Sequence, residues 1–140
     1  MKLLRINHLG IASPGLADAM ARMERLFGRQ ADHVEEVPDQ KVKTAFYGVG
    51  ESHLEWLEST DPEGPIGRFL QKRGPGIHHV CFEVDDIDAA CAELGARGVK
   101  MIDPTPRDGA HGCRVAFIHP SEMGGVLVEL SQSPAGGTHA

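Results

Sequence analysis

Two histidine–glutamate pairs are the residues of this chain whose types and spacing could do chemistry. His8 is followed by Glu55 after 47 residues, and His79 is followed by Glu129 after 50 residues. One such residue alone would most simply belong to the surface or the core, because charged side chains are mostly solvated. The repeated pairing favours a common task. Two imidazoles and two carboxylates suit Co, Mn, Ni, Fe or Zn and would leave two positions of an octahedral ion open.

Both glutamates lie in strand-like runs, SHLEWLES and GGVLVELS, where each stands between two apolar residues. Alternate residues of a β-strand point to opposite faces of the sheet. Each glutamate is therefore expected to face away from its apolar neighbours, toward water or toward a polar site.

The elements that must position these residues repeat along the chain. Each half opens with a short β-rich run headed by histidine, INHLGIAS and HHVCFEV. A helical pattern follows in each half, over residues 16–27 with Ser13 as the expected N-cap, and from residue 87 to a stop at Gly98. Further β-like runs follow, KTAFYGVG and SHLEWLES in one half, CRVAFIHP and GGVLVELS in the other. Each half therefore predicts a βαβββ module, and the fold class is α+β.

The length of 140 residues suits a single domain with its own core. The repeat divides it into a first module over about 3–60, a linking helix over about 62–74, a second module over about 76–132 and a tail over 133–140.

No apolar run is long enough to span a membrane. A net charge of −6 without a basic run argues against nucleic-acid binding.

The compartment is expected to be the cytoplasm, because the N-terminal residues lack the apolar region and cleavage site of a signal peptide. Three scattered cysteines, Cys81, Cys91 and Cys113, are expected to be free thiols in a reducing environment.

Paired βαβββ modules with histidine and glutamate in these places resemble the vicinal-oxygen-chelate (glyoxalase/bleomycin resistance/dioxygenase) superfamily, in which a curved mixed sheet surrounds a metal site. Within it the chain is most similar to the methylmalonyl-CoA epimerase branch, over most of residues 7–130. The resemblance is carried by EEVPDQKVKTAF, SHLEWLES, PIGRFLQKRGPGIHHVCFEVDDIDAACAELGARGVKMID and GCRVAFIHPSEMGGVLVEL. The parts GIHH…EVDDI and HP…GGVLVEL are the more specific ones.

The resemblance implies metal ligands at His8, Glu55, His79 and Glu129. His78 competes with His79, but aligning NHLGIAS with HHVCFEV pairs His8 with His79. His78 would then face the other way and is expected to pack within the structure.

The resemblance also implies an isomerase that interconverts (2R)- and (2S)-methylmalonyl-CoA through a metal-stabilised enolate. One group must remove the α proton and another must return it. Glu129 is the expected first partner, and the second is either Glu55 or a group that the sequence leaves unassigned. Thr44 stands where some epimerases carry a glutamate proposed as a base, and a threonine cannot serve as a base near neutral pH.

Two further residues match substrate-binding positions of the branch. Gln40 is either a contact of the acyl group or a turn residue beside Pro38. Arg114 either meets the anionic substrate or ties down its own hairpin. The resemblance further implies a homodimer that binds a small acyl-CoA, and the native metal and the acyl-chain preference stay open.

Two other functions compete with this interpretation. A lactoylglutathione lyase (glyoxalase I) would use the same ligands on the hemithioacetal of methylglyoxal and glutathione. A metal-free drug-binding protein would use the same fold, but such members tend to lose ligand positions, whereas all four are filled here.

Overall fold

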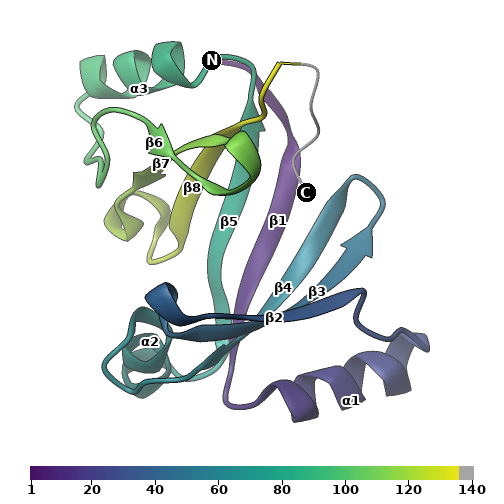
Figure 1. Cartoon of the computed structure of the whole chain (residues 1–140). Helices are drawn as coiled ribbons and strands as arrows, with labels where there is room; N and C mark the ends of the chain where they lie inside the picture. Colours follow the sequence, from purple (N-terminus) through teal and green to yellow (C-terminus); the bar gives the residue numbers. More distant parts are fainter. Residues whose placement is uncertain (136–140) are drawn as a thin grey trace. The chain divides into compact units, whose positions relative to one another are not determined.

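The structure of the protein, a computed structural model, describes residues 1–135 (Figure 1). Within them the chain forms eight strands and three α-helices, so the predicted α+β class is confirmed. The elements are β1 (Leu3–Ser13), α1 (Leu16–Phe27), β2 (His33–Val37), β3 (Val42–Val49), β4 (Ser52–Ser59), α2 (Pro65–Arg73), β5 (Gly76–Val84), α3 (Ile87–Ala96), β6 (Arg107–Asp108), β7 (Arg114–Ile118) and β8 (Leu127–Gln132), with short 3₁₀ turns η1 (Pro38–Gln40), η2 (Ala110–Gly112) and η3 (Pro120–Met123).

The chain divides into two compact units. The first unit is His8–His78, and within the described residues the second unit joins Met1–Asn7 to residues 79–135. Strand β1 thus contributes its first residues to the second unit. Of the predicted tail over 133–140, residues 136–140 lie outside the described part of the chain.

The sheet of the first unit has the strand order β2-β3-β4-β1. Strands β1 and β4 pair in parallel, with His8 opposite His53 and Gly10 opposite Glu55. The other pairs are antiparallel, and Phe46 of β3 lies opposite Glu55. The run SHLEWLES coincides with β4. Strand β2 is the remaining strand that the βαβββ pattern requires, and no alternating run in the sequence had indicated its position.

One face of this sheet packs against α1. Leu16 and Met23 of the helix form a buried cluster with Ala45 and Tyr47 of β3, and Leu54 and Trp56 of β4 pack against it. These positions alternate with those of Glu55, so the prediction that Glu55 faces away from its apolar neighbours is confirmed.

The other face, which carries Glu55, packs at one end against α2. Ile66 of this helix is buried with Ala12, Val42 and Leu57, whose side chains come from β1, β3 and β4. The predicted linking helix is thus present as α2. It packs against the apolar residues at one end of the sheet face that carries Glu55.

The start of α1 differs from the prediction. The N-cap is Gly15, and no side chain of the helix's own first turn caps it. Ser13, the expected cap, instead exchanges hydrogen bonds with the backbone of Gly15. The backbone N–H of Leu16 donates to Oε1 of Glu58 on β4 at 2.8 Å, so a residue 42 positions away does the work of the cap.

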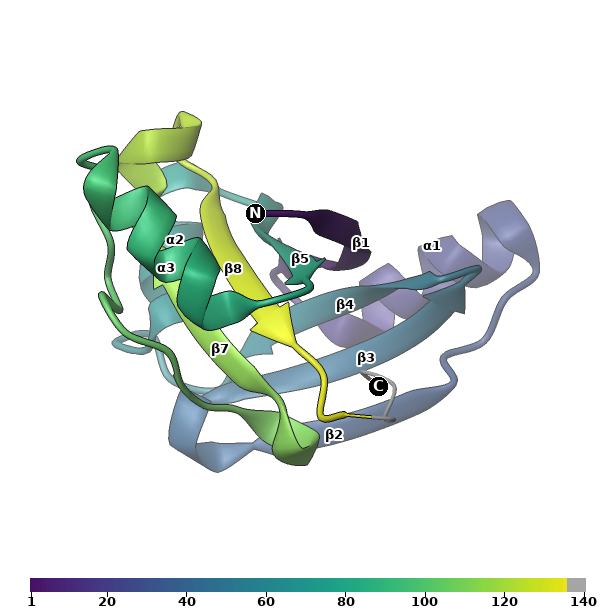
Figure 2. The ribbon, with the colours of Figure 1, turned by 90° about the horizontal axis from the view of Figure 1, so that it is seen from above.

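The second unit repeats this arrangement. Its strands run β5-β8-β7-β6, with β5 and β8 parallel and β7 antiparallel to β8. Helix α3 lies over β7 and β8 (Figure 2). Asp86 caps α3 by accepting a hydrogen bond from the N–H of Ala89 at 3.1 Å. The four apolar residues of α3 at helical spacing are all buried: Ile87, Ala90, Cys91 and Leu94.

The three cysteines are free and buried, which confirms the expected free thiols. Burial raises the pKa of the thiols of Cys91 and Cys113, so both are held in the protonated, unreactive form.

No helix within residues 1–135 is long and apolar enough to cross a membrane.

Replacement of Glu58 by alanine should weaken α1, because the N–H of Leu16 then loses its acceptor. We expect a loss of about 1 kcal/mol in the free energy of unfolding, the usual cost of removing a side-chain cap. Glu58→Gln should lose much less, since its amide oxygen still accepts. Urea unfolding measures both, and Glu63→Ala, whose side chain is 77% exposed, is the control. Equal stability of Glu58→Ala and the control would contradict this role.

Candidate metal centre

Two histidines of the first unit converge on one carboxylate oxygen. Oε2 of Glu55 lies 2.7 Å from Nε2 of His53 and 3.4 Å from Nδ1 of His8. The candidate ligand atoms of all three residues lie within 4.8 Å of one another. The side chain of His8 is 6% exposed, while those of Glu55 and His53 are 16% and 15% exposed. Two imidazoles beside a carboxylate form a donor set that suits a divalent first-row metal.

The β1–β4 pairing produces this convergence. Because the strands run in parallel with His8 opposite His53, the two rings project from the same face and stack, with centroids 4.9 Å apart. Glu55 follows His53 by two residues and shares that face. A side chain of strand β1 and two of strand β4 therefore meet without help from any loop.

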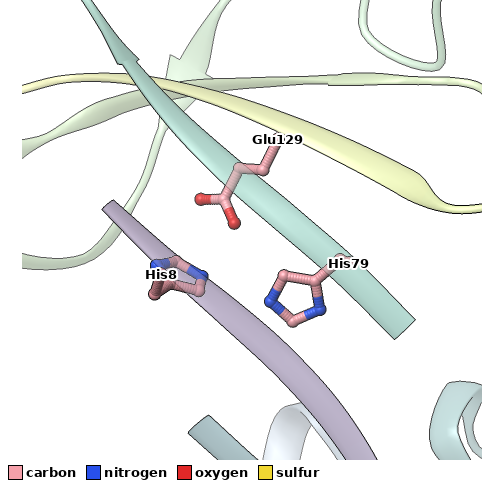
Figure 3. Close-up of side chains that lie close together, drawn as sticks. All are labelled: His8, His79 and Glu129. Atoms are coloured by element: carbon pink, nitrogen blue, oxygen red, sulfur yellow. The ribbon is translucent and has the colours of Figure 1, made fainter. Parts of the chain in front are cut away.

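The second unit supplies a histidine and a glutamate in the same way. His79 extends from β5 and Glu129 from β8, as Figure 3 shows together with His8 on β1. Cys81 lies opposite Glu129 in the parallel pairing, so His79, two residues before Cys81, shares a face with Glu129. Val128 and Leu130 point to the other face and are buried. The predicted orientation of Glu129 is therefore confirmed.

The ring of His78 packs within the structure, as the sequence analysis expected. Its ring contacts the ring of Phe69 on α2 edge-on, with centroids 5.0 Å apart. The contact gives His78 a packing role within the first unit.

Residues 7–117 match the family model of the Glyoxalase/Bleomycin resistance protein/Dioxygenase superfamily. The chain belongs to this superfamily. The mitochondrial methylmalonyl-CoA epimerase of Dictyostelium discoideum is 42% identical over 129 residues, which are 91% of this chain and 78% of that protein. The ethylmalonyl-CoA/methylmalonyl-CoA epimerase of Cereibacter sphaeroides is 38% identical over 130 residues, covering 91% of this chain and 97% of that protein.

The fold agrees with this membership. A solved structure of a Streptomyces coelicolor methylmalonyl-CoA epimerase variant, in complex with 2-nitronate-propionyl-CoA, has a TM-score of 0.81 and 34% sequence identity. The match covers 96% of this chain and 97% of that chain. The resemblance on which the sequence analysis relied is thereby confirmed for the superfamily and for its epimerase branch.

His53 is the member of the cluster that sequence reasoning missed. It lies two residues before Glu55, and the period of two in a strand would have placed it on the same face. The repeat directed attention to His8 and His79 instead, because no histidine stands two residues before Glu129. In this superfamily member the first unit thus carries one more imidazole than the repeat predicts.

Thr44 lies on the same sheet face as Glu55. Its register partner is Leu57, and the neighbouring pair on that face is Phe46 with Glu55. The residue is 3% exposed. A buried hydroxyl at this place can donate or accept a hydrogen bond, but it supplies no base near neutral pH.

The two candidate substrate-binding residues lie in different settings. Gln40 is exposed at the end of η1, next to Lys41, whose positive φ of 56° closes the turn. Arg114 donates two hydrogen bonds to Asp88 of α3, at 2.5 and 3.0 Å. In β7, Arg114 shares its face with Ala116 and Ile118, the face opposite to that of Glu129. The structure thus shows Arg114 tying β7 to α3, a contact that differs from the expected tie within its own hairpin.

The Arg114–Asp88 pair makes stability depend on pH. The guanidinium of Arg114 lowers the pKa of the Asp88 carboxyl. A group whose pKa is lowered in the folded state stabilises it above the ordinary pKa, and this contribution is lost as the pH falls through the lowered value.

Replacement of Arg114 by glutamine should therefore lower Tm at neutral pH, and the difference from the wild type should shrink below about pH 4, where aspartate is ordinarily protonated. Thermal unfolding at several pH values measures this. Arg97→Gln, which removes an exposed arginine bound to Glu93 at the end of α3, is the matched control. An unchanged Tm together with a raised KM for an acyl-CoA would instead assign Arg114 to the substrate.

Proposed function

We propose that this protein is a metal-dependent epimerase that interconverts (2R)- and (2S)-methylmalonyl-CoA. The observation that carries the proposal is that all four ligand positions of the epimerase branch hold competent ligands, in a chain related to epimerases over nearly its whole length. The name of one relative includes both ethylmalonyl-CoA and methylmalonyl-CoA. The acyl preference of this chain is therefore part of what an assay must determine.

The proposed metal ligands are His8, Glu55, His79 and Glu129. Within the first unit, the group of candidate ligands that contains His8 and Glu55 supports the set. The donor set of two imidazoles and two carboxylates fits Co, Mn, Ni, Fe or Zn. When bound, such a cation would act as a Lewis acid that stabilises the negative charge on the thioester oxygen.

The residues of the chain would then move the proton. Inversion at the α carbon requires one group to take the proton from one side and another to deliver a proton from the other side. We assign these roles to the carboxylates of Glu129 and Glu55. Each comes from the last strand of its module, and general acid–base help of this kind is typically worth about 10²–10⁴-fold in rate.

The rest of the substrate would be held outside this centre. We propose that Gln40 contacts the acyl group, since its exposed amide can both donate and accept hydrogen bonds. The phosphates of CoA need positive charge against a net charge of −6. Arg68 and Lys72, both exposed on α2, could supply it. A homodimer and a cytoplasmic location complete the proposal, the latter supported by three reduced thiols.

Two alternatives are separable by simple measurements. A lactoylglutathione lyase would bind the metal but would turn over the hemithioacetal of methylglyoxal and glutathione instead of an acyl-CoA. A metal-free drug-binding protein would hold almost no metal after purification and reloading.

Metal-loaded protein in D₂O should introduce deuterium at the α carbon of methylmalonyl-CoA, followed by NMR or mass spectrometry. Glu129→Gln should slow this exchange by about 10²-fold or more, because an amide cannot take up the proton. Glu36→Gln, the same change at an exposed residue of β2, is the control and should exchange at the wild-type rate. Full exchange by Glu129→Gln would remove Glu129 from the mechanism, and no exchange by the metal-loaded wild type would reject the epimerase.

Removal of the metal with a chelator should abolish the exchange, and addition of Co²⁺ or Mn²⁺ should restore it. Elemental analysis should find about one divalent ion per chain in the active form, as four ligands around one ion require. A metal content near zero that leaves the exchange rate unchanged would contradict the metal-dependent mechanism.

A further inference from the structure

His53 is a residue of the site face that the proposed ligand set does not use. Its Nε2 lies 2.7 Å from Oε2 of Glu55, a hydrogen-bond distance between two side chains that are each about 15% exposed. In the tautomer that carries its proton on Nε2, the ring donates to the carboxylate, because an ionised carboxylate offers only acceptors. The bond in that tautomer occupies one lone pair of the Glu55 oxygen.

His53 also contacts the other proposed ligand of the first unit. Its ring stacks on that of His8 with centroids 4.9 Å apart and an interplanar angle of 27°. The same oxygen of Glu55 lies 3.4 Å from Nδ1 of His8. One side chain thus touches both proposed ligands, one through a hydrogen bond and one through its ring face.

The ring of His53 is itself held in place by its neighbours. Phe46 of β3 contacts it from the other side, at a centroid distance of 5.9 Å, and His33 of β2 stacks on Phe46 at 5.5 Å. The four strands of the first unit thus contribute one ring each to a row: His8, His53, Phe46 and His33. A packed ring between two aromatic neighbours has few rotamers open to it, so its N–H keeps its direction.

We propose that His53 is a positioning residue of the metal centre, which orients the Glu55 carboxylate through its Nε2–H and braces the His8 ring by stacking. The inference rests on the proposed function, in which Glu55 and His8 are ligands. Ligating carboxylates are commonly hydrogen-bonded by an outer partner, and loss of such a partner typically costs about 10–100-fold in metal affinity. His53 has the geometry of that partner, and no histidine stands two residues before Glu129 to do the same in the second module.

The test compares two replacements of His53. His53→Leu keeps the bulk but removes the N–H, whereas His53→Gln places an amide N–H near the position of Nε2. Each metal-free variant is titrated with Co²⁺, which reports its Kd and, through its visible absorption spectrum, the geometry of its ligands. His33→Leu is the matched control, because it removes a histidine from the far end of the same row, where the side chain is 60% exposed.

We expect the Kd for Co²⁺ to rise about 10–100-fold in His53→Leu and to recover most of that loss in His53→Gln. The absorption spectrum of His53→Gln should match that of the wild type, and His33→Leu should match in both affinity and spectrum. Circular dichroism establishes that each variant is folded.

Two results would overturn the inference. A wild-type Kd in folded His53→Leu would show that the hydrogen bond does not support the site. A Kd in His53→Gln as weak as in His53→Leu, with an altered spectrum, would mean that the imidazole itself binds the metal. Glu55→Ala separates these results from failure of the proposed function, because normal Co²⁺ binding by that variant would reject Glu55 as a ligand, whatever His53 does.

Discussion

The parallel pairing of the first and last strands of each module is the constraint from which the candidate site follows. Parallel neighbours cannot be joined by a tight turn, and the chain between them must cross over with a helix or further strands. Here that crossover holds one helix and two strands in each module, β1 pairing with β4 and β5 with β8. The separations of 47 and 50 residues between histidine and glutamate span these crossovers together with parts of the paired strands.

The alternation of side chains along the strands then separates packing from chemistry. In the first unit, Leu54 and Trp56 face α1, while Glu55 between them faces the opposite way with His8 and His53. Burial of a carboxylate is costly unless it is hydrogen-bonded or paired. Two imidazoles around Glu55 meet that requirement, and the same arrangement makes the group a competent donor set for a cation.

Local patterns predicted much of this from the sequence. The helical pattern that begins at Ile87 located α3, and the alternation in SHLEWLES located β4 and the direction of Glu55. Contacts that join distant residues were beyond local patterns. Glu58 caps α1 from a strand 42 residues away, and the short strand β2, largely exposed, has no alternation to reveal it. His53 was missed because it lacks a counterpart in the repeat. Its position two residues before Glu55 would have placed it on the same sheet face.

The duplicated module also suits the chemistry of an inversion. An epimerase must perform the same proton transfer twice, as removal on one side of a carbon and as delivery on the other, so two groups of like kind and similar pKa serve it best. A repeat provides such groups directly, since each module ends in a strand that carries one glutamate, Glu55 or Glu129. With threonine at position 44, this chain carries no third carboxylate at that place.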